Sequence, residues 1–144
     1  IDVAEAPDDK EPTVVEWAPA PAMPDRAADR AETVVLDAVE GGPMGVMWRI
    51  NGQAHAMEPL FEFAKGETVD MTIRNMLGPE HPFHLHGQFF SIKGMPGLWD
   101  TVLIPGQATV EITAYMDNPG EWMMHCHIAE HAEVGMMSSF IVTE

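Results

Sequence analysis

The chain has 144 residues, of which 46% are hydrophobic and 21% are charged, and this composition is ordinary for one soluble globular domain with its own core. Its formal net charge of −16 argues against nucleic acid or an anionic membrane surface as a partner, and favours cations or a basic protein. No apolar run is long enough to span a bilayer, and the single cysteine, Cys126, excludes an internal disulfide.

Residues 1–31 consist mainly of Ala, Pro, Asp and Glu, with few large apolar side chains. Such a segment cannot bury enough apolar surface to fold alone, so we predict an extended arm or interdomain linker, with Trp17 as its anchor on the surface that holds it. The chain starts at Ile1 without a secretory signal. We therefore expect either a processed mature form or a piece of a longer protein.

Residues 32–144 show short alternating segments separated by turn signals, a pattern that predicts an all-β fold. The expected strands, in chain order, are 33–39, 46–50, 68–74, 81–86 running into 89–92, 109–115, 120–125 and 138–142. Turn sequences that contain Gly, Pro or Asn follow the first two strands and precede the strand at 120–125. Seven or eight strands, with one helical turn within 127–133, predict a Greek-key β-sandwich.

The metal-binding chemistry of the chain is concentrated around its only cysteine. Cys126 is followed by His131 after five residues and by Met136 after ten. A thiolate, an imidazole and a thioether are three of the four ligands of a blue-copper centre, and a second imidazole must come from elsewhere, with the histidine-rich segment 81–87 as the source. A closed zinc site would need more thiolates and no thioether, and a lone buried cysteine would need none of the spaced partners.

Two His-x-His pairs suggest a second metal cluster. His125 and His127 alternate past Cys126, and His84 and His86 alternate past Leu85. In extended segments each pair therefore points to one face, and the two pairs can converge from neighbouring strands. Four imidazoles without a thiolate fit copper that binds oxygen. Because both histidines of the first pair are bonded neighbours of the cysteine, electrons that arrive at the thiolate have a short covalent route to them.

The two motifs together, HPFHLHG at 81–87 and GEWMMHCHIAEHAEVGMM at 120–137, resemble the C-terminal cupredoxin domain of the multicopper oxidases, the family of laccases, cuprous oxidases and ferroxidases. Segments 48–52, 100–102 and 105–106 resemble that domain too, so the resemblance covers roughly residues 33 to 144. It implies a cupredoxin-like Greek-key β-sandwich, and an expected ligand for each kind of copper. The type 1 ligands would be His81, Cys126, His131 and the axial Met136; the type 2 ligand His84; and the type 3 ligands His86, His125 and His127.

The resemblance also implies a function and a location. The family oxidises a small reducing substrate, such as a phenol or a metal ion, one electron at a time at type 1 copper, and reduces dioxygen to water at a trinuclear cluster. Cys126, His125 and His127 are then the expected catalytic residues, and the expected location is periplasmic or secreted. The alternative is a single-domain blue-copper protein that carries electrons or copper without oxidase turnover.

The sequence departs from the family in two respects. The trinuclear cluster of the family takes four His-x-His pairs, and this chain has two of them. We therefore expect that a homo-oligomer or a second chain completes the cluster, or that the half-site stays open. In addition, Ala132 stands where many relatives place an acidic residue thought to help deliver protons, so Glu130 or Glu133 would have to substitute.

The remaining histidine and the methionines allow more than one interpretation. His55 stands alone, so a surface or hydrogen-bonded histidine is the favoured interpretation and an auxiliary copper ligand is the alternative. The favoured role of the methionines is to fill the core, and the alternative is a Cu(I)-binding face. The chain has twelve methionines, among them Met44, Met47, Met57, Met95, Met123 and Met124.

Overall fold

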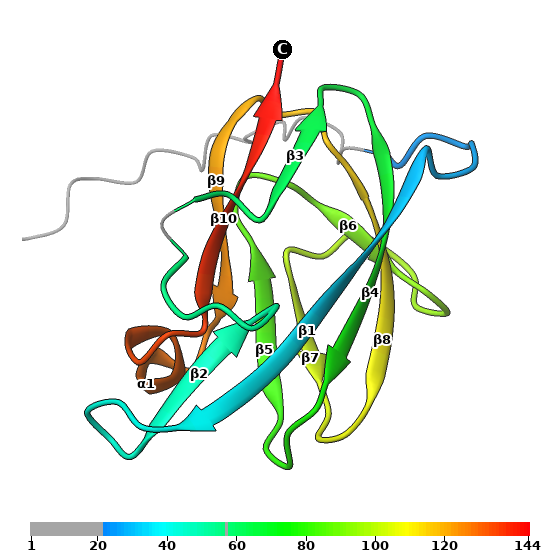
Figure 1. Cartoon of the computed structure of the whole chain (residues 1–144). Coiled ribbons are helices and arrows are strands. Elements are labelled where there is room, and N and C mark those ends of the chain that lie inside the picture. Colours follow the sequence, from blue (N-terminus) through cyan, green and yellow to red (C-terminus); the bar gives the residue numbers. More distant parts are fainter. Residues whose placement is uncertain (1–21, 57) are drawn as a thin grey trace, which may run out of the picture.

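The computed structural model describes residues 22–56 and 58–144, which form two five-stranded sheets and one short helix (Figure 1). The first sheet has the order β2-β1-β4-β8-β6 and the second has the order β3-β10-β9-β5-β7. The strands of the first sheet are β1 (Arg30–Glu40), β2 (Val46–Ile50), β4 (Thr68–Asn75), β6 (Phe90–Ile92) and β8 (Thr109–Tyr115). Those of the second are β3 (Phe61–Ala64), β5 (His81–Leu85), β7 (Thr101–Ile104), β9 (Gly120–Cys126) and β10 (Met137–Thr143).

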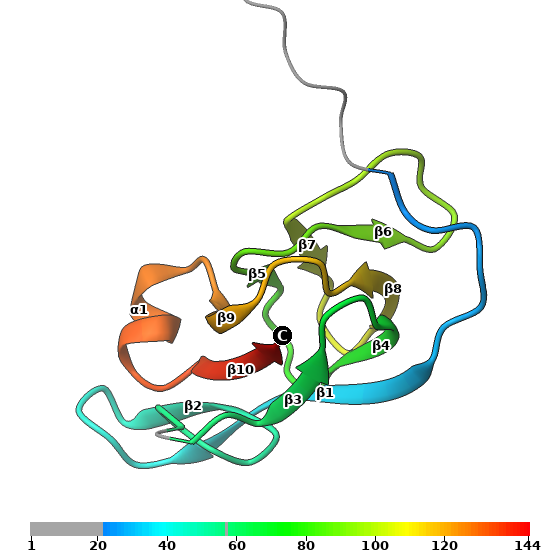
Figure 2. The ribbon, with the colours of Figure 1, turned by 90° about the horizontal axis from the view of Figure 1, so that it is seen from above.

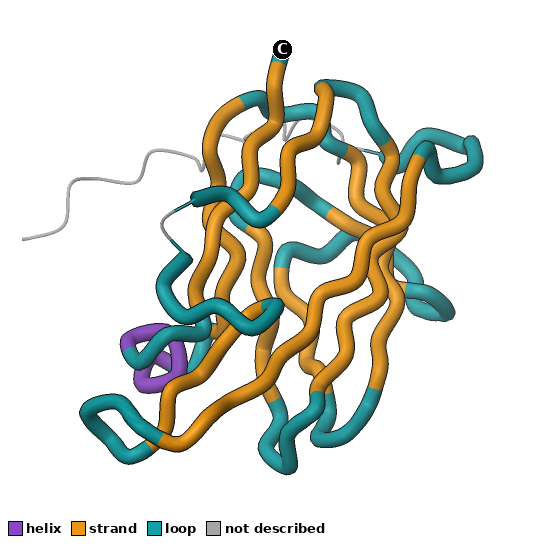
Figure 3. The backbone as a smooth tube through the Cα atoms, in the orientation of Figure 1, coloured by secondary structure: helices purple, strands orange, loops and turns teal. Residues whose placement is uncertain are grey.

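The predicted all-β sandwich is confirmed, with differences at its edges. The described residues contain ten strands rather than seven or eight, because β3 and β7, two edge strands of four residues each, were not predicted. The helical turn is α1 (Ala129–Glu133), the only helix of the described part (Figure 3). β1 begins at Arg30, inside the predicted arm. Residues 1–21, including Trp17, and Met57 lie outside the described residues.

The two sheets face each other across one apolar core (Figure 2). Alternate residues of each strand point inward, as the pleat requires, so β4 contributes Val69, Met71 and Ile73, and β5 contributes Phe83 and Leu85. The chain changes sheet between β4 and β5 and at each of the next connections up to β9. These crossings place β5 beside β9, although the two strands are far apart in sequence. Within the described residues no helix is long and apolar enough to cross a membrane.

Two loops meet tightly just before β5 begins. The buried Asn75 side chain donates to the carbonyl oxygens of Pro79, Ile104 and Pro105 at 2.7, 3.3 and 3.1 Å, which ties the β4–β5 loop to the end of β7. A Cβ atom on Gly106 would lie 1.8 Å from the Gly78 carbonyl oxygen. Only glycine allows this approach, which fixes the backbone from which β5 starts.

Replacing Gly106 with alanine is therefore expected to lower the free energy of unfolding by about 1–3 kcal/mol, because the methyl group meets backbone and not a movable side chain. Gly78→Ala is the matched control on the other side of the same contact, since a Cβ there has open space around it. Urea unfolding of both variants measures the difference. Equal stabilities for the two would show that the contact is not tight.

Candidate copper site

β5 and β9 bring the two histidine motifs together as antiparallel neighbours. Phe83 pairs with Cys126, and His84 pairs with His125. In both strands the residues alternate between the core and the outer face of the second sheet. His81 and Cys126 are buried, whereas His84 and His125 are half-buried on the outer face. One pair of strands therefore presents two different sets of metal-binding groups on its two faces.

On the core side, His81, Cys126 and His131 form one group. The Cys126 Sγ atom lies 3.6 Å from His81 Nδ1 and 3.8 Å from His131 Nδ1, and these two nitrogens are 3.1 Å apart. All three donor atoms lie within 4.8 Å of one another. His81 comes from the start of β5, Cys126 from the end of β9, and His131 from α1. The structure thus brings together three of the four predicted type 1 ligands.

Met136, the fourth, lies in the connection between α1 and β10 and is fully buried. Its backbone N–H donates to the His131 carbonyl oxygen at 2.8 Å, and its carbonyl oxygen accepts from the Cys126 N–H at 3.2 Å. These two bonds hold the Met136 backbone against the backbones of His131 and Cys126. The assignment of its sulfur as axial ligand stays a prediction.

Burial shifts the pKa values of His81, Cys126 and His131. Burial, and secondly the neighbouring His131 imidazole, lower the pKa of His81 to about 4. Burial also lowers the pKa of His131, although Glu130 opposes the shift. Burial raises the pKa of the Cys126 thiol, partly offset by the Ile128 N–H, which donates to the sulfur. Near pH 7 the imidazoles are therefore neutral and able to bind metal, and the thiol gives up its proton when a metal binds.

The copper-free chain is expected to lose stability in mild acid because of His81. The unfolded chain takes up the proton near pH 6.5, and the folded chain only near pH 4. This contribution to stability is complete above about pH 6.5 and is lost as the pH falls to about 4. Between pH 7 and 4.5 the free energy of unfolding, measured with urea, should fall by about 2 kcal/mol more than in His81→Phe. Equal falls in the two proteins would contradict the assignment.

On the outer face, His84, His86, His125 and His127 form a second group, called here the four-histidine face. Donor atoms of three of them, His84, His125 and His127, lie within 4.8 Å of one another. The fourth joins them through His86 Nε2, which is 2.9 Å from His125 Nε2. The ring centroids of the neighbouring pairs lie between 4.5 and 5.5 Å apart. The structure therefore brings together all four residues predicted to bind type 2 and type 3 copper.

Backbone carbonyls orient two of these rings. His84 Nδ1 donates to the Asp100 carbonyl oxygen at 2.7 Å and lies 3.0 Å from the Thr101 hydroxyl. His125 Nδ1 donates to the Cys126 carbonyl oxygen at 2.9 Å. Because Nδ1 is engaged in both rings, Nε2 is the nitrogen that would bind a metal. Asp100 and Thr101 enter the site at the junction with β7, a strand that was not predicted.

Trp48 in β2 is a further residue of the site that sequence reasoning did not single out. Its ring lies 4.1 Å from the His131 ring, tilted by 33°, and 5.5 Å edge-on from the His81 ring. The Trp48 backbone N–H donates to the Val134 carbonyl oxygen at 3.2 Å. A Cβ atom on Gly135 would lie 2.3 Å from the Trp48 carbonyl oxygen, so a glycine there permits the close approach. Segment 48–52 is part of the sequence resemblance, but nothing in it indicates that its tryptophan packs on the predicted copper ligands.

The donor sets fit copper. A thiolate and two Nδ1 donors, with a thioether next in the loop, match the ligand types that select a Cu(I)/Cu(II) couple. The four-histidine face offers only imidazole nitrogen donors, which also suit copper. Neither set matches a closed zinc site, which would use additional thiolates.

Comparison with known proteins agrees with this chemistry. The sequence model of the multicopper oxidase family matches residues 28–144. The chain belongs to this family. Multicopper oxidase MmcO from Mycobacterium tuberculosis is 34% identical to it over 101 residues, which cover 67% of this chain and 20% of that protein. L-ascorbate oxidase from Cucumis sativus is 36% identical over 101 residues, which cover 54% of this chain and 17% of that protein.

Solved structures of multicopper oxidases share the fold. A multi-copper oxidase from Pseudomonas thermotolerans has a TM-score of 0.64 at 30% identity, over 90% of this chain and 34% of that one. A metallo-oxidase from Campylobacter jejuni has a TM-score of 0.76 at 21% identity, over 84% of this chain and 31% of that one. The cupredoxin fold is therefore confirmed. Members of the family bind copper at type 1, type 2 and type 3 sites.

The chain spans only 16% to 20% of the length of the first curated multicopper oxidases that it matches. The match therefore assigns the family, the fold and copper as the family's cofactor. The roles of single residues, and the activity of a whole oxidase, are proposals for this chain.

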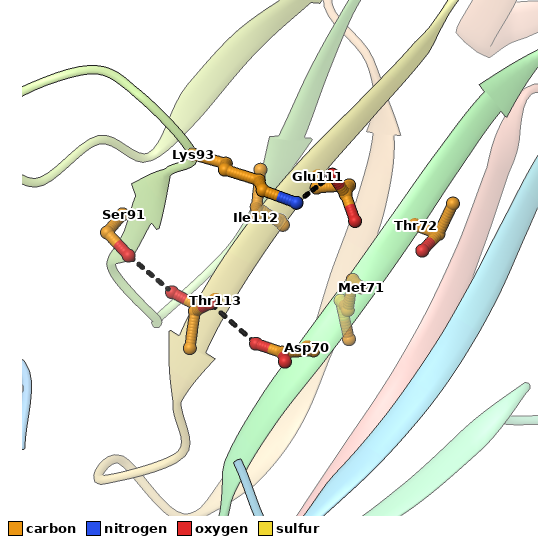
Figure 4. Close-up of a pocket in the computed structure, with 8 residues that line it drawn as sticks. All are labelled: Asp70, Met71, Thr72, Ser91, Lys93, Glu111, Ile112 and Thr113. Atoms are coloured by element: carbon orange, nitrogen blue, oxygen red, sulfur yellow. Dashed lines mark hydrogen bonds and ion pairs between the residues drawn. The ribbon is translucent and has the colours of Figure 1, made fainter. Parts of the chain in front are cut away.

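A cavity of about 290 Å³ on the outer face of the first sheet offers no comparable donor set (Figure 4). Four of its polar side chains are paired with one another. Lys93 Nζ lies 2.6 Å from Glu111 Oε2, and the Thr113 hydroxyl donates to Asp70 Oδ1 at 2.6 Å. Among the described residues, the cavity lining contains no histidine or cysteine.

Proposed function

We propose that this chain is the copper-binding domain of an oxidase that takes electrons from a small reducing substrate, such as a phenol or a metal ion, and passes them to dioxygen. The observation that carries the proposal is the placement of two donor sets on opposite faces of β5 and β9. Bound copper supplies a one-electron acceptor on the core side and the site of oxygen reduction on the outer face.

The two faces of the second sheet would bind different kinds of copper. His81, Cys126 and His131, with Met136 as axial ligand, would hold type 1 copper. The His131 side chain is partly exposed on α1, so a reducing substrate would deliver its electrons to the type 1 group through this ring. His125 and His127 are covalently bonded to Cys126, which gives electrons a route of a few bonds from the thiolate to the four-histidine face.

The four-histidine face would hold type 2 copper through His84 and the type 3 pair through His86, His125 and His127. Four imidazoles supply half of the ligands that the family uses for a trinuclear cluster. The half-buried to exposed position of these rings is consistent with completion by a second chain or a second copy of this chain. Activity is then expected only in the assembly, and a periplasmic or secreted location is proposed from the family resemblance.

The test is oxygen consumption by the copper-loaded assembly with a phenol, a ferrous salt or a cuprous salt as reductant. The proposal expects four reducing equivalents to be consumed per dioxygen, with water as the product. Added catalase should then release no oxygen. Release of half of the consumed oxygen would indicate hydrogen peroxide, and no consumption with any reductant would refute oxidase turnover in that assembly.

A second candidate function is supported by one observation. His81, Cys126 and His131 converge within this one chain, whereas the four-histidine face would be half of the cluster that the family uses. A single-domain blue-copper carrier needs only the first set. Such a protein would be reduced and reoxidised by partners and would consume no oxygen.

A further inference from the structure

The outer face of the second sheet carries soft metal donors beside the four-histidine face. In the antiparallel pair of β9 and β10, Met123 lies opposite Ser139, and Met137 lies opposite His125. Directly paired residues share a face, so both methionines lie on the outer face with His125. Met123 and Met137 are diagonal neighbours there. Their long, flexible side chains can reach a common point, since diagonal neighbours on a sheet lie about 7–8 Å apart at the backbone.

The β2–β3 connection, which contains His55, is hydrogen-bonded to the chain just before β10 and to β10 itself. The His55 backbone N–H donates to the Gly135 carbonyl oxygen at 3.1 Å, and the Leu60 backbone N–H donates to the Ser139 carbonyl oxygen at 2.9 Å. The connection is thus fixed on both sides of Met137. His55 has a φ of 47°, in the left-handed region, where histidine occurs more often than most residues with a side chain.

These residues line one open cavity of about 380 Å³. Its lining residues include His55, Met123, Met137 and Glu121. Glu121 accepts a hydrogen bond from the Ser139 hydroxyl at 3.2 Å, which keeps its negative charge at the rim. Thioethers are soft donors that prefer Cu(I) over hard divalent ions, and an imidazole is a common copper ligand as well.

We propose that His55, Met123 and Met137 form an accessory site for a soft monovalent cation, Cu(I) or its redox-inert analogue Ag(I). The site is distinct from the type 1 group, because its methionines lie on the opposite face of the sheet from Cys126. It lies next to the four-histidine face through the pairing of Met137 with His125. The two interpretations left open for His55 and for the methionines are thereby joined into one site. The site does not depend on the proposed oxidase function.

The test is an Ag(I) titration of the copper-free chain with ¹³C-labelled methionine methyl groups, followed by NMR. Each methyl group reports its own location: Met136 the type 1 group, Met123 and Met137 the accessory site, and Met44 and Met95 the remaining surface. Met44 and Met95 are 63% and 49% exposed and serve as controls. We expect the Met123 and Met137 signals to shift together in one saturable step, while the two control signals stay in place.

Variants then assign the donors. Met123→Leu with Met137→Leu conserves volume and removes both thioethers, and should weaken this Ag(I) binding step at least tenfold, as monitored by the His55 ring signals. His55→Ala should weaken it too, whereas Met44→Leu with Met95→Leu should not. Cu(I) competition against bicinchoninate should give the same order. Unchanged Met123 and Met137 signals at saturation, equal shifts at Met44 and Met95, or binding that survives the double leucine variant would overturn the proposal. None of these outcomes depends on blue copper or on oxygen consumption.

Discussion

Cys126→Ser is expected to abolish the blue absorption of the copper-loaded protein and to lower its rate of substrate oxidation at least about a thousandfold. Cys126 is the chain's only cysteine, so no other thiolate can take its place. Serine is nearly the same size but offers a hydroxyl that stays protonated and is a hard donor. The two Nδ1 atoms would remain, without the thiolate that gives the centre its colour and its covalent link to His125 and His127.

The effect should be confined to the metal centre. Met124→Leu is the matched control, because Met124 is also buried on the core side of β9 and is not among the expected type 1, type 2 or type 3 ligands. Visible absorption of the copper-loaded proteins and circular dichroism of the copper-free proteins distinguish loss of the site from loss of the fold. A blue band that persists in folded Cys126→Ser would refute the type 1 assignment.

His84→Ala is expected to lower oxygen consumption by at least about a thousandfold while leaving the blue absorption unchanged. His84 lies on the outer face, and Cys126 lies on the core face of the neighbouring strand. Removing the imidazole therefore deletes one donor of the four-histidine face without touching the three donor atoms of the type 1 group. The two properties should separate cleanly in the assembled protein.

A graded variant and a control sharpen this result. Thr101→Val removes the hydroxyl that lies 3.0 Å from His84 Nδ1, and loss of such an orienting partner is expected to reduce activity about 10–100-fold. Glu111→Gln, on the outer face of the first sheet, should have no effect on oxygen consumption. Oxygen uptake and the visible spectrum are recorded on the same samples. If His84→Ala consumed oxygen at the rate of the unaltered protein, the four-histidine face would have no part in turnover.

Local pattern was sufficient to predict much of this molecule. The alternation of His84 and His86 past Leu85, and of His125 and His127 past Cys126, depends only on extended backbone. The structure has extended backbone in β5 and up to the end of β9, and it separates the two sets of donors between the faces. The long alternating strands, such as β4 and β8, were also predicted for the same reason.

Features that depend on contacts between distant segments were not predicted. β3 has four residues and is held by parallel pairing with β10, where Phe61 pairs with Phe140. β7 is equally short and exists as the edge partner of β5. Both segments contain aromatic or β-branched residues, but four residues are too few for a local pattern to identify a strand, and pairing with a neighbouring strand stabilises them. The packing of Trp48 on His131, and the cavity shared by His55 and the outer-face methionines, likewise depend on contacts between segments that are far apart in the sequence.

We propose that one chain carries a type 1 centre and half of an oxygen-reducing cluster. The number of copper ions per chain in the purified particle, recorded with its mass in solution and its near-ultraviolet and visible spectrum, tests this proposal. We expect an assembly with more than one copper per chain, a blue band, and a second, near-ultraviolet band from the type 3 copper pair. A monomeric chain with one copper, a blue band and no second band would contradict the oxidase and indicate an electron or copper carrier.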